Sequence, residues 1–271
     1  MFNDDINQSL RENLTTTSLG RSLVVAESLE STNLTVREMA NQGIPHGLVV
    51  AADHQTGGLG RNGRVWQSPA GVNLYFSMLL RPACPPGIVP QVAILTALAE
   101  RRALAQLLPQ LDVQLKWPND VWVRGRKLSG ILCTMSCQGI RTDYAIVGVG
   151  LNVNALEADF AQDIRARATS LRRLTGQSFA RGKVLAFLLN HFESLYGEWL
   201  NAASLSPFLE EWRQASVLEG KQVTVEQGNS PVSGVVDGIT PDGQLILHNG
   251  TRTRLATAGD AHVVGLPSVP D

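Results

Sequence analysis

The sequence is poor in the residues that define several large classes of protein. Its 271 residues include three cysteines, Cys84, Cys133 and Cys137, an odd set without paired spacing. A disulfide scaffold needs an even, patterned set, and a zinc site needs further ligands besides the cysteines. We therefore expect reduced thiols with a structural role and a cytoplasmic protein.

Other absences narrow the function. No apolar run is long enough to span a bilayer, and the first residues lack the basic and apolar regions of a signal peptide. The formal net charge of −1 lacks the basic excess typical of nucleic-acid binding. The five histidines lie in unrelated contexts, so no Ser-His-Asp set is evident. We expect no membrane, no nucleic acid and no activated protein nucleophile.

What the chain does have is a loop rich in glycine and arginine, residues 53–66, after a predicted strand at 48–52. Three of its glycines match the dinucleotide-binding pattern G-x-G-x-x-G. They are Gly58, Gly60 and Gly63. That pattern requires a helix to begin within the glycines and an acidic residue about 20 positions later. Here another predicted strand, 73–78, follows and no acidic residue lies at that distance, so we reject a dinucleotide site.

The same loop suits an anion. Glycines let backbone N–H groups approach a ligand, and Arg61 and Arg64 supply forked donors for phosphate or carboxylate. A surface hairpin with solvated arginines is the alternative. Because few apolar residues precede Trp66, we expect the loop to be mobile without ligand.

A second polar segment interrupts the apolar run 113–123. Pro118 cannot donate to a strand ladder, so the strand is broken or bulged there, which re-aims the neighbouring side chains. These are Lys116, Asn119 and Asp120. A turn at 124–126 then places Lys127 at the start of the next strand, near the end of its hairpin partner. A solvated turn lysine is the alternative.

Two further features are ambiguous. Ser31, Thr32 and Asn33 all suit a helix N-cap, but only one can serve as the cap. The others either hold a polar ligand or have no further role. Gly148 and Gly150 lie within a predicted strand, which indicates close approach of a ligand or of another segment.

The apolar pattern changes character near residue 217. Before it, strands alternate with helices; after it, short strands are separated by hairpin signals. These are Gly228-Asn229, Asp242-Gly243 and Asn249-Gly250. We predict a large domain over 1–216 and a small β-barrel over 217–271.

Five segments, in the same order, resemble the biotin protein ligases, and the resemblance covers nearly the whole chain. They are residues 30–33, 55–66, 116–120, 126–132 and 148–152. The resemblance implies an α+β fold. It has a catalytic domain like that of class II aminoacyl-tRNA synthetases, with a mixed β-sheet and flanking helices, and a C-terminal SH3-like β-barrel.

The resemblance also implies an activity. ATP and biotin, with Mg²⁺, would give biotinyl-5'-AMP and pyrophosphate, and biotin would then pass to a lysine of the biotin carboxyl carrier protein of acetyl-CoA carboxylase. The protein would be a monomer or a homodimer. Lipoate–protein ligase, of the same superfamily, is the alternative.

The matching positions carry expected roles. The catalytic residues are Lys127, Arg61 and Arg64. The biotin-binding residues are Ser31, Thr32, Asn33, Gln55, Gly58, Gly60, Arg61, Lys127 and Gly130. The ATP-binding residues are Arg64, Trp66, Lys116, Asn119, Asp120 and Asn152, and Asp120 is also the expected metal ligand.

The chain departs from the family pattern in two places. Many members read Gly-Arg-Gly-Arg in the loop, whereas Leu59 stands here in place of the first arginine. The regulatory members carry a DNA-binding domain before the catalytic core, and Ser31 lies too near the start of this sequence to leave room for one. We therefore expect the monofunctional type rather than a transcriptional regulator.

Overall fold

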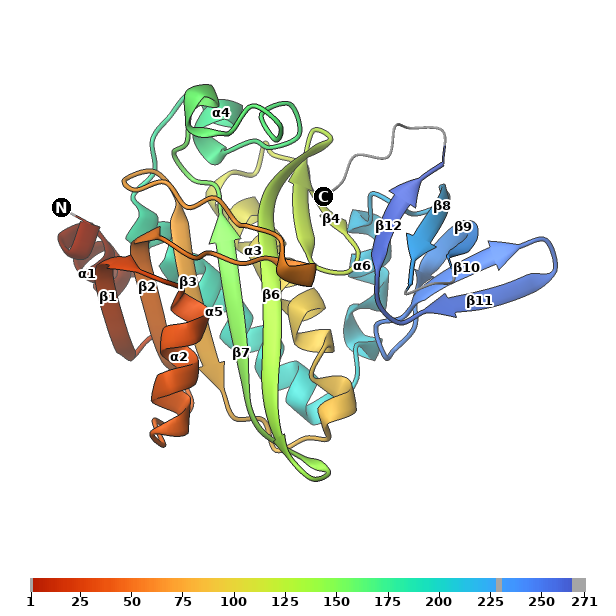
Figure 1. The fold of residues 1–271 in the computed structure, drawn as a ribbon, viewed down its shortest axis with the longest axis horizontal. Helices are drawn as coiled ribbons and strands as arrows, with labels where there is room; N and C mark the ends of the chain where they lie inside the picture. The colour runs from red at the N-terminus through yellow and green to blue at the C-terminus, as the bar shows by residue number, and fades with distance from the viewer. Residues whose placement is uncertain (1, 228–230, 265–271) are drawn as a thin grey trace.

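The computed structural model describes residues 2–227 and 231–264, which form two β-sheets, the first flanked by helices (Figure 1). The turn expected at Gly228-Asn229 lies outside the described residues. The boundary expected between residues 216 and 217 stays a prediction. The second sheet begins shortly after it, at Gln222.

The first sheet has seven strands in the order β1-β2-β3-β7-β6-β5-β4. Their bounds are β1 (Ser22–Leu29), β2 (Leu48–Gln55), β3 (Leu74–Leu80), β4 (Val113–Lys116), β5 (Asp120–Val123), β6 (Arg126–Gln138) and β7 (Arg141–Leu151). β1 and β2 are parallel, and the other neighbours are antiparallel. The predicted mixed sheet is confirmed.

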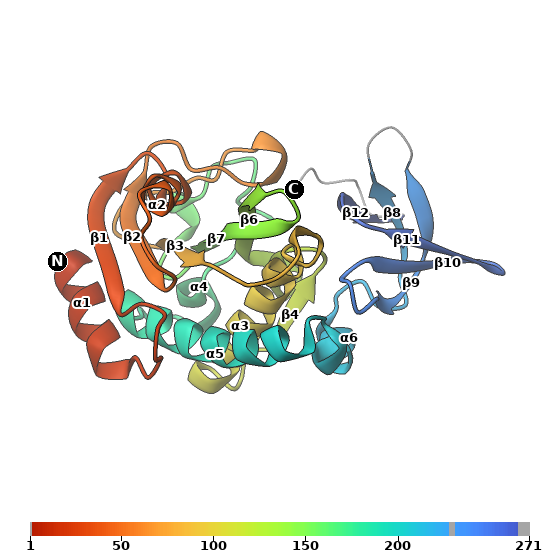
Figure 2. The same ribbon diagram turned by 90° about the horizontal axis from the view of Figure 1, so that it is seen from below.

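Helices cover both faces of this sheet. They are α1 (Phe2–Asn13), α2 (Thr32–Asn41), α3 (Gln91–Leu107), α4 (Leu171–Thr175), α5 (Arg181–Ala202) and α6 (Leu209–Ala215), with short 3₁₀ turns at Arg61–Gly63, Pro86–Ile88, Glu157–Asp159 and Ser206–Phe208. α2 lies on one face, and α3 and α5 lie on the other (Figure 2). In the part of the chain that the structure describes, no helix is long and apolar enough to cross a membrane.

Burial on both faces explains the continuous apolar runs in the central strands. In β2, Val49 and Ala51 join the core beneath α3 and α5, whereas Val50 joins the smaller core beneath α2. Because successive strand side chains point to opposite faces, neither face of this strand reads as polar in the sequence.

The run 113–123 is broken rather than bulged. β4 and β5 are separate strands that pair antiparallel, with Lys116 opposite Asp120. Pro118 lies in the tight connection between them, where no ladder N–H is required. Lys116 and Asp120 thereby face each other across the end of a hairpin, and this end reaches the pocket described below.

The second sheet has five antiparallel strands in the order β11-β10-β9-β8-β12. Their bounds are β8 (Gln222–Glu226), β9 (Val232–Ile239), β10 (Leu245–Asn249), β11 (Arg252–Ala256) and β12 (Asp260–Val263). The connection before β10 is tied to the first sheet, because the indole of Trp117 donates a hydrogen bond of 2.9 Å to the carbonyl of Gly243. The predicted C-terminal β domain is confirmed as this antiparallel sheet.

Two glycines leave open space for a Cβ but differ in backbone conformation. A Cβ at Gly197, inside α5, or at Gly176, after α4, would meet no atom within 4 Å. Gly197→Ala should raise the free energy of unfolding by about 0.5–1 kcal/mol, because glycine is a poor helix residue. Gly176→Ala should lower it by about 1–2 kcal/mol, since φ is +77° there. Urea denaturation of both variants tests this, and a loss of stability in Gly197→Ala would contradict it.

Candidate functional site

A cavity of about 1060 Å³ lies between the first sheet, the glycine–arginine loop and β12 of the second sheet. Its walls include all but one of the predicted site residues. They are Ser31, Thr32, Asn33, Gln55, Gly60, Arg61, Arg64, Trp66, Lys116, Asn119, Asp120, Lys127, Gly130 and Asn152. The exception is Gly58, which is buried behind the wall, where a Cβ would lie 2.6 Å from the carbonyl oxygen of Trp66. Close packing against Trp66 therefore explains why a glycine is needed at position 58.

One end of the cavity is formed by the start of α2. Ser31 occupies the N-cap position, but its side chain makes no capping hydrogen bond within the described chain. Instead, the side-chain oxygen of Gln55 accepts a bond of 2.8 Å from the backbone N–H of Thr32. Gln55 thus serves the helix end, and the hydroxyl of Ser31 is left on the cavity wall.

The glycines of β7 make room for other segments of the chain. A Cβ at Gly148 would overlap the side-chain amide of Asn33, and one at Gly150 would overlap the indole of Trp66. Gly130 pairs with Gly150 in the ladder, and a Cβ there would lie 2.9 Å from the same indole. Two facing glycines therefore form a flat floor on which Trp66 rests. The buried Nε1 of Trp66 has no hydrogen-bond partner among the residues that the structure describes.

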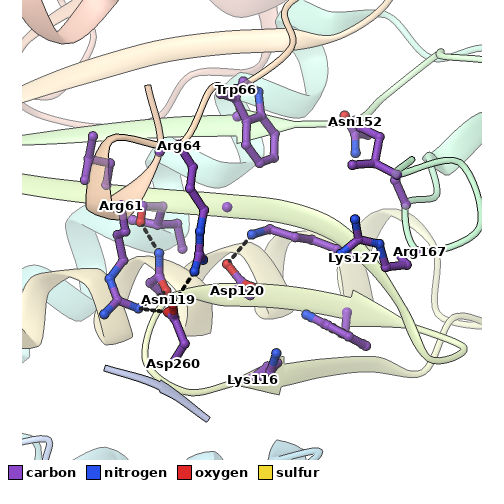
Figure 3. Close-up of a pocket in the computed structure, with 18 of the residues that line it drawn as sticks. Arg61, Arg64, Trp66, Lys116, Asn119, Asp120, Lys127, Asn152, Arg167 and Asp260 are labelled. Carbon is purple, nitrogen blue, oxygen red and sulfur yellow. Dashed lines mark hydrogen bonds and ion pairs between the residues drawn. The ribbon is translucent and has the colours of Figure 1, made fainter. Parts of the chain in front are cut away.

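Lys127 is not a solvated turn lysine. Its ammonium lies 2.8 Å from Asp120 and 5.6 Å from the ring centre of Trp66 (Figure 3). Its backbone is held as well, because its N–H donates a bond of 2.7 Å to the carbonyl of Arg167. The Asp120 side chain is only 7% exposed, so this ion pair is poorly screened by water.

The glycine–arginine loop has polar anchors that the sequence did not reveal. Arg64 lies 2.6 Å and Arg61 3.4 Å from the carboxylate of Asp260, at the start of β12 (Figure 3). Arg61 also donates a bond of 3.1 Å to the side chain of Asn119. No α-helix begins within the described loop, and the next strand, β3, follows it as expected from the sequence. The expectation that little holds this loop needs correction, since both arginines are paired with a buried acid.

Two acidic residues in and near the site, Asp260 and Glu100, were not among those expected from the sequence. Asp260 lies in the distant C-terminal sheet, and nothing in its local sequence signals a role. Glu100 is fully buried on α3, where the Ser129 hydroxyl donates a bond of 3.0 Å to it. Burial raises the pKa of Glu100 to about 8, so it is mostly protonated at neutral pH and adds little negative charge near Asp120. The sequence did carry one signal for Glu100, because this carboxylate lies on the apolar face of a predicted helix.

The site is suited to anions. Six lysine and arginine side chains line it, and the carboxylates of Asp120 and Asp260 pair with three of them. The six are Arg61, Arg64, Lys116, Lys127, Arg167 and Lys221. Guanidinium and ammonium groups of this kind bind phosphate and carboxylate. In the described ranges no group of three or more His, Cys, Asp or Glu residues could hold a metal ion.

The glycine floor generates a test. Gly150→Ala should push the Trp66 indole off the sheet, because the added methyl group would occupy its position. We expect a loss of about 1–3 kcal/mol in stability from overpacking and stronger acrylamide quenching of Trp66 fluorescence. The Trp66 signal is isolated by subtracting spectra of matched Trp66→Phe variants. Gly87→Ala, where a Cβ meets nothing within 4 Å, is the control. Unchanged Trp66 quenching in Gly150→Ala would refute this packing role.

Comparison with known proteins relates both parts of the chain to one group. The sequence model of the Biotin/lipoate A/B protein ligase family matches residues 25–152, and that of the Biotin protein ligase C terminal domain matches residues 220–263. The biotin–[acetyl-CoA-carboxylase] ligase of Mycobacterium tuberculosis is 34% identical over 260 residues, covering 93% of each protein. The bifunctional ligase/repressor BirA of Bacillus subtilis is 33% identical over 238 residues, covering 88% of this chain and 73% of that protein.

A solved structure of a biotin protein ligase has a similar fold. The biotin protein ligase from Aquifex aeolicus in complex with biotin and ATP superposes with a TM-score of 0.77 at 28% sequence identity. The match covers 89% of this chain and 98% of that one.

Proposed function

Because the chain belongs to the biotin/lipoate A/B protein ligase family, we propose that it is an ATP-dependent biotin protein ligase. It joins biotin to AMP with release of pyrophosphate, then transfers biotin to a lysine of a carrier protein. The observation that carries the proposal is the position of Lys127, between Asp120 and the Trp66 platform on the wall of the cavity.

The comparisons favour biotin over lipoate. The Mycobacterium tuberculosis and Paracoccus denitrificans relatives are biotin–[acetyl-CoA-carboxylase] ligases, and the Aquifex aeolicus structure holds biotin and ATP. By analogy, the acceptor here is the biotin carboxyl carrier domain of acetyl-CoA carboxylase. A cytoplasmic location and a monomeric or homodimeric state stay predictions.

The chemistry explains why cations dominate the cavity. Biotin's carboxylate must attack the α-phosphate of ATP, so two anions have to be brought together and their repulsion offset. Lys127 would contact both, with Arg61 and Arg64 of the loop beside it and Lys116 on the nucleotide side of the same cavity. Positioning and charge stabilisation suffice for phosphoryl chemistry of this type. The acceptor lysine supplies the nucleophile of the second step.

The remaining wall residues divide between the two ligands. Biotin lies toward the start of α2, against Ser31, Thr32, Asn33 and Gln55, with Gly60 of the loop beside it; Gly130 contributes indirectly, by leaving room for Trp66 and Lys127. The nucleotide lies toward Trp66, Asn119, Asp120 and Asn152. The flat indole of Trp66, supported by the Gly130–Gly150 floor, suits an adenine ring.

Asp120 fits a magnesium ion that arrives with the triphosphate. Mg²⁺ is usually bound by one or two carboxylates together with substrate phosphates, so a single acidic side chain is sufficient. The Oδ1 atom of Asp120 is buried and accepts no hydrogen bond within the described chain apart from its ion pair with Lys127. When bound, the ion would neutralise phosphate charge, while Asp120 and Lys127 hold each other in position.

The function is tested by incubating the protein with ATP, labelled biotin and an isolated carrier domain. We expect covalent biotin on the carrier and pyrophosphate in equal amount, with labelled lipoate giving no product.

Lys127→Ala should reduce biotinyl-AMP formation by about 10²-fold or more, because both anions lose their shared counter-charge. The control is Lys183→Ala, an exposed lysine on α5. A Lys127→Ala variant that keeps more than half of wild-type adenylation would refute the catalytic role assigned to Lys127.

A substitution at Asp120 should affect the two steps of the reaction, adenylate formation and biotin transfer, to different extents. Asp120→Asn should impair adenylate formation far more than transfer, since only the first step involves the triphosphate and its metal. Synthetic biotinyl-AMP should therefore restore most of the carrier labelling. If labelling stays low with the synthetic intermediate, Asp120 serves folding or carrier docking instead.

A further inference from the structure

The C-terminal sheet contributes one acidic side chain to the cavity, and both arginines of the loop contact it. Arg64 donates to Oδ2 of Asp260 at 2.6 Å, Arg61 lies 3.4 Å from Oδ1, and Asn62 donates to Oδ2 at 3.4 Å. Three positions of one loop thus meet a single carboxylate from a sheet nearly 200 residues later in the chain. Figure 3 shows the two guanidinium groups turned toward this carboxylate.

The backbone before Asp260 is also shaped for this contact. The carbonyl of Gly259 accepts a bond of 3.1 Å from Arg61. Gly259 has φ of +120°, and a Cβ there would overlap the carbonyl oxygen of Glu226 on the neighbouring strand. Only glycine combines this conformation with such close packing. The Gly259-Asp260 pair therefore presents both a carbonyl and a carboxylate to the loop.

Burial makes the contact strong. The Asp260 side chain is 8% exposed, against 22% for Arg61 and 38% for Arg64. Two guanidinium groups this close would repel each other without a shared anion, and a buried carboxylate is weakly screened by salt. Asp260 thus offsets the charge that would otherwise push the loop away from the sheet.

The contact leaves donors for a substrate. A guanidinium carries five N–H donors, and the bond from Arg64 to Asp260 is made by Nη2 alone. Nε and Nη1 of Arg64 can therefore meet an anionic ligand while Asp260 remains in place. The carboxylate is compatible with a substrate-bound loop and need not be displaced.

We propose that Asp260 is a positioning residue that holds the loop 57–66 over the cavity before substrate binds, so that the C-terminal sheet sets the affinity for the anionic substrate. For ATP and biotin as substrates, this inference rests on the proposed function. Its first consequence, that the loop is held in place without ligand, does not rest on the proposed function.

The test is amide hydrogen exchange on the ligand-free, full-length protein. Asp260→Asn removes the charge and keeps the shape, and it should speed exchange in residues 57–66 by about tenfold, the effect of losing a charge-assisted contact. The matched control is Glu226→Gln, because Glu226 faces Asp260 in the β8–β12 ladder but is exposed. Exchange in the control should equal wild type.

Steady-state kinetics distinguish positioning from a merely structural role. Asp260→Asn should raise the KM for ATP by about five- to tenfold with kcat changed less than twofold, because binding must first recruit a loosened loop. Unchanged loop exchange overturns the proposal. Faster exchange with an unchanged or lower KM also overturns it, since the loop would then be held for no benefit to binding.

A second variant keeps the test decisive if Asp260→Asn disturbs β12 itself. Arg64→Gln breaks the same ion pair from the loop side and leaves the second sheet intact. It should speed loop exchange by a smaller factor, because Arg61 still contacts Asp260. The double variant should add little to Asp260→Asn, which already removes the Arg64 contact. Unchanged exchange in Arg64→Gln, or full additivity, overturns the proposal. An inactive wild-type protein would instead count against the proposed function alone.

Discussion

The site depends on keeping several positive charges close together in a partly buried cavity. Three of these cations are held by two carboxylates from different parts of the chain. Asp120 on β5 pairs with Lys127, and Asp260 on β12 pairs with the two arginines of the loop. Without these partners the repulsion between the cations would disperse them, and the two anions of the reaction would find no common binding surface.

The sheet gives this charge arrangement a rigid support. β6 and β7 lie side by side in its centre, and their paired glycines at 130 and 150 let Trp66 lie directly on the backbone. The indole in turn packs near the ammonium of Lys127. A larger residue at either glycine would move a ring and, through it, the lysine. The two glycines thus help to position a charged side chain, although they carry no charge themselves.

The two sheets are functionally linked because the loop bridges them. Arg61 contacts Asn119 of the first sheet region and Gly259 and Asp260 of the second. In the five-segment resemblance only the catalytic core carried site residues. Asp260 and its neighbours on β12 line the cavity, so the C-terminal sheet contributes to its wall as well.

The sequence alone determined the elements and most of the wall. Apolar periodicity and turn residues indicated strands, helices and the later hairpins, whereas the mixed sheet was implied by the family resemblance. Lys116, Asp120 and Lys127 could be grouped because they lie on neighbouring strands of local hairpins. Tertiary structure alone decided what holds the loop and why the strand glycines are needed. Asp260 lies about 200 residues from its partners, and Trp66 reaches Gly150 across the sheet. Local spacing carries no information about such contacts, because they arise only when the separate elements pack together.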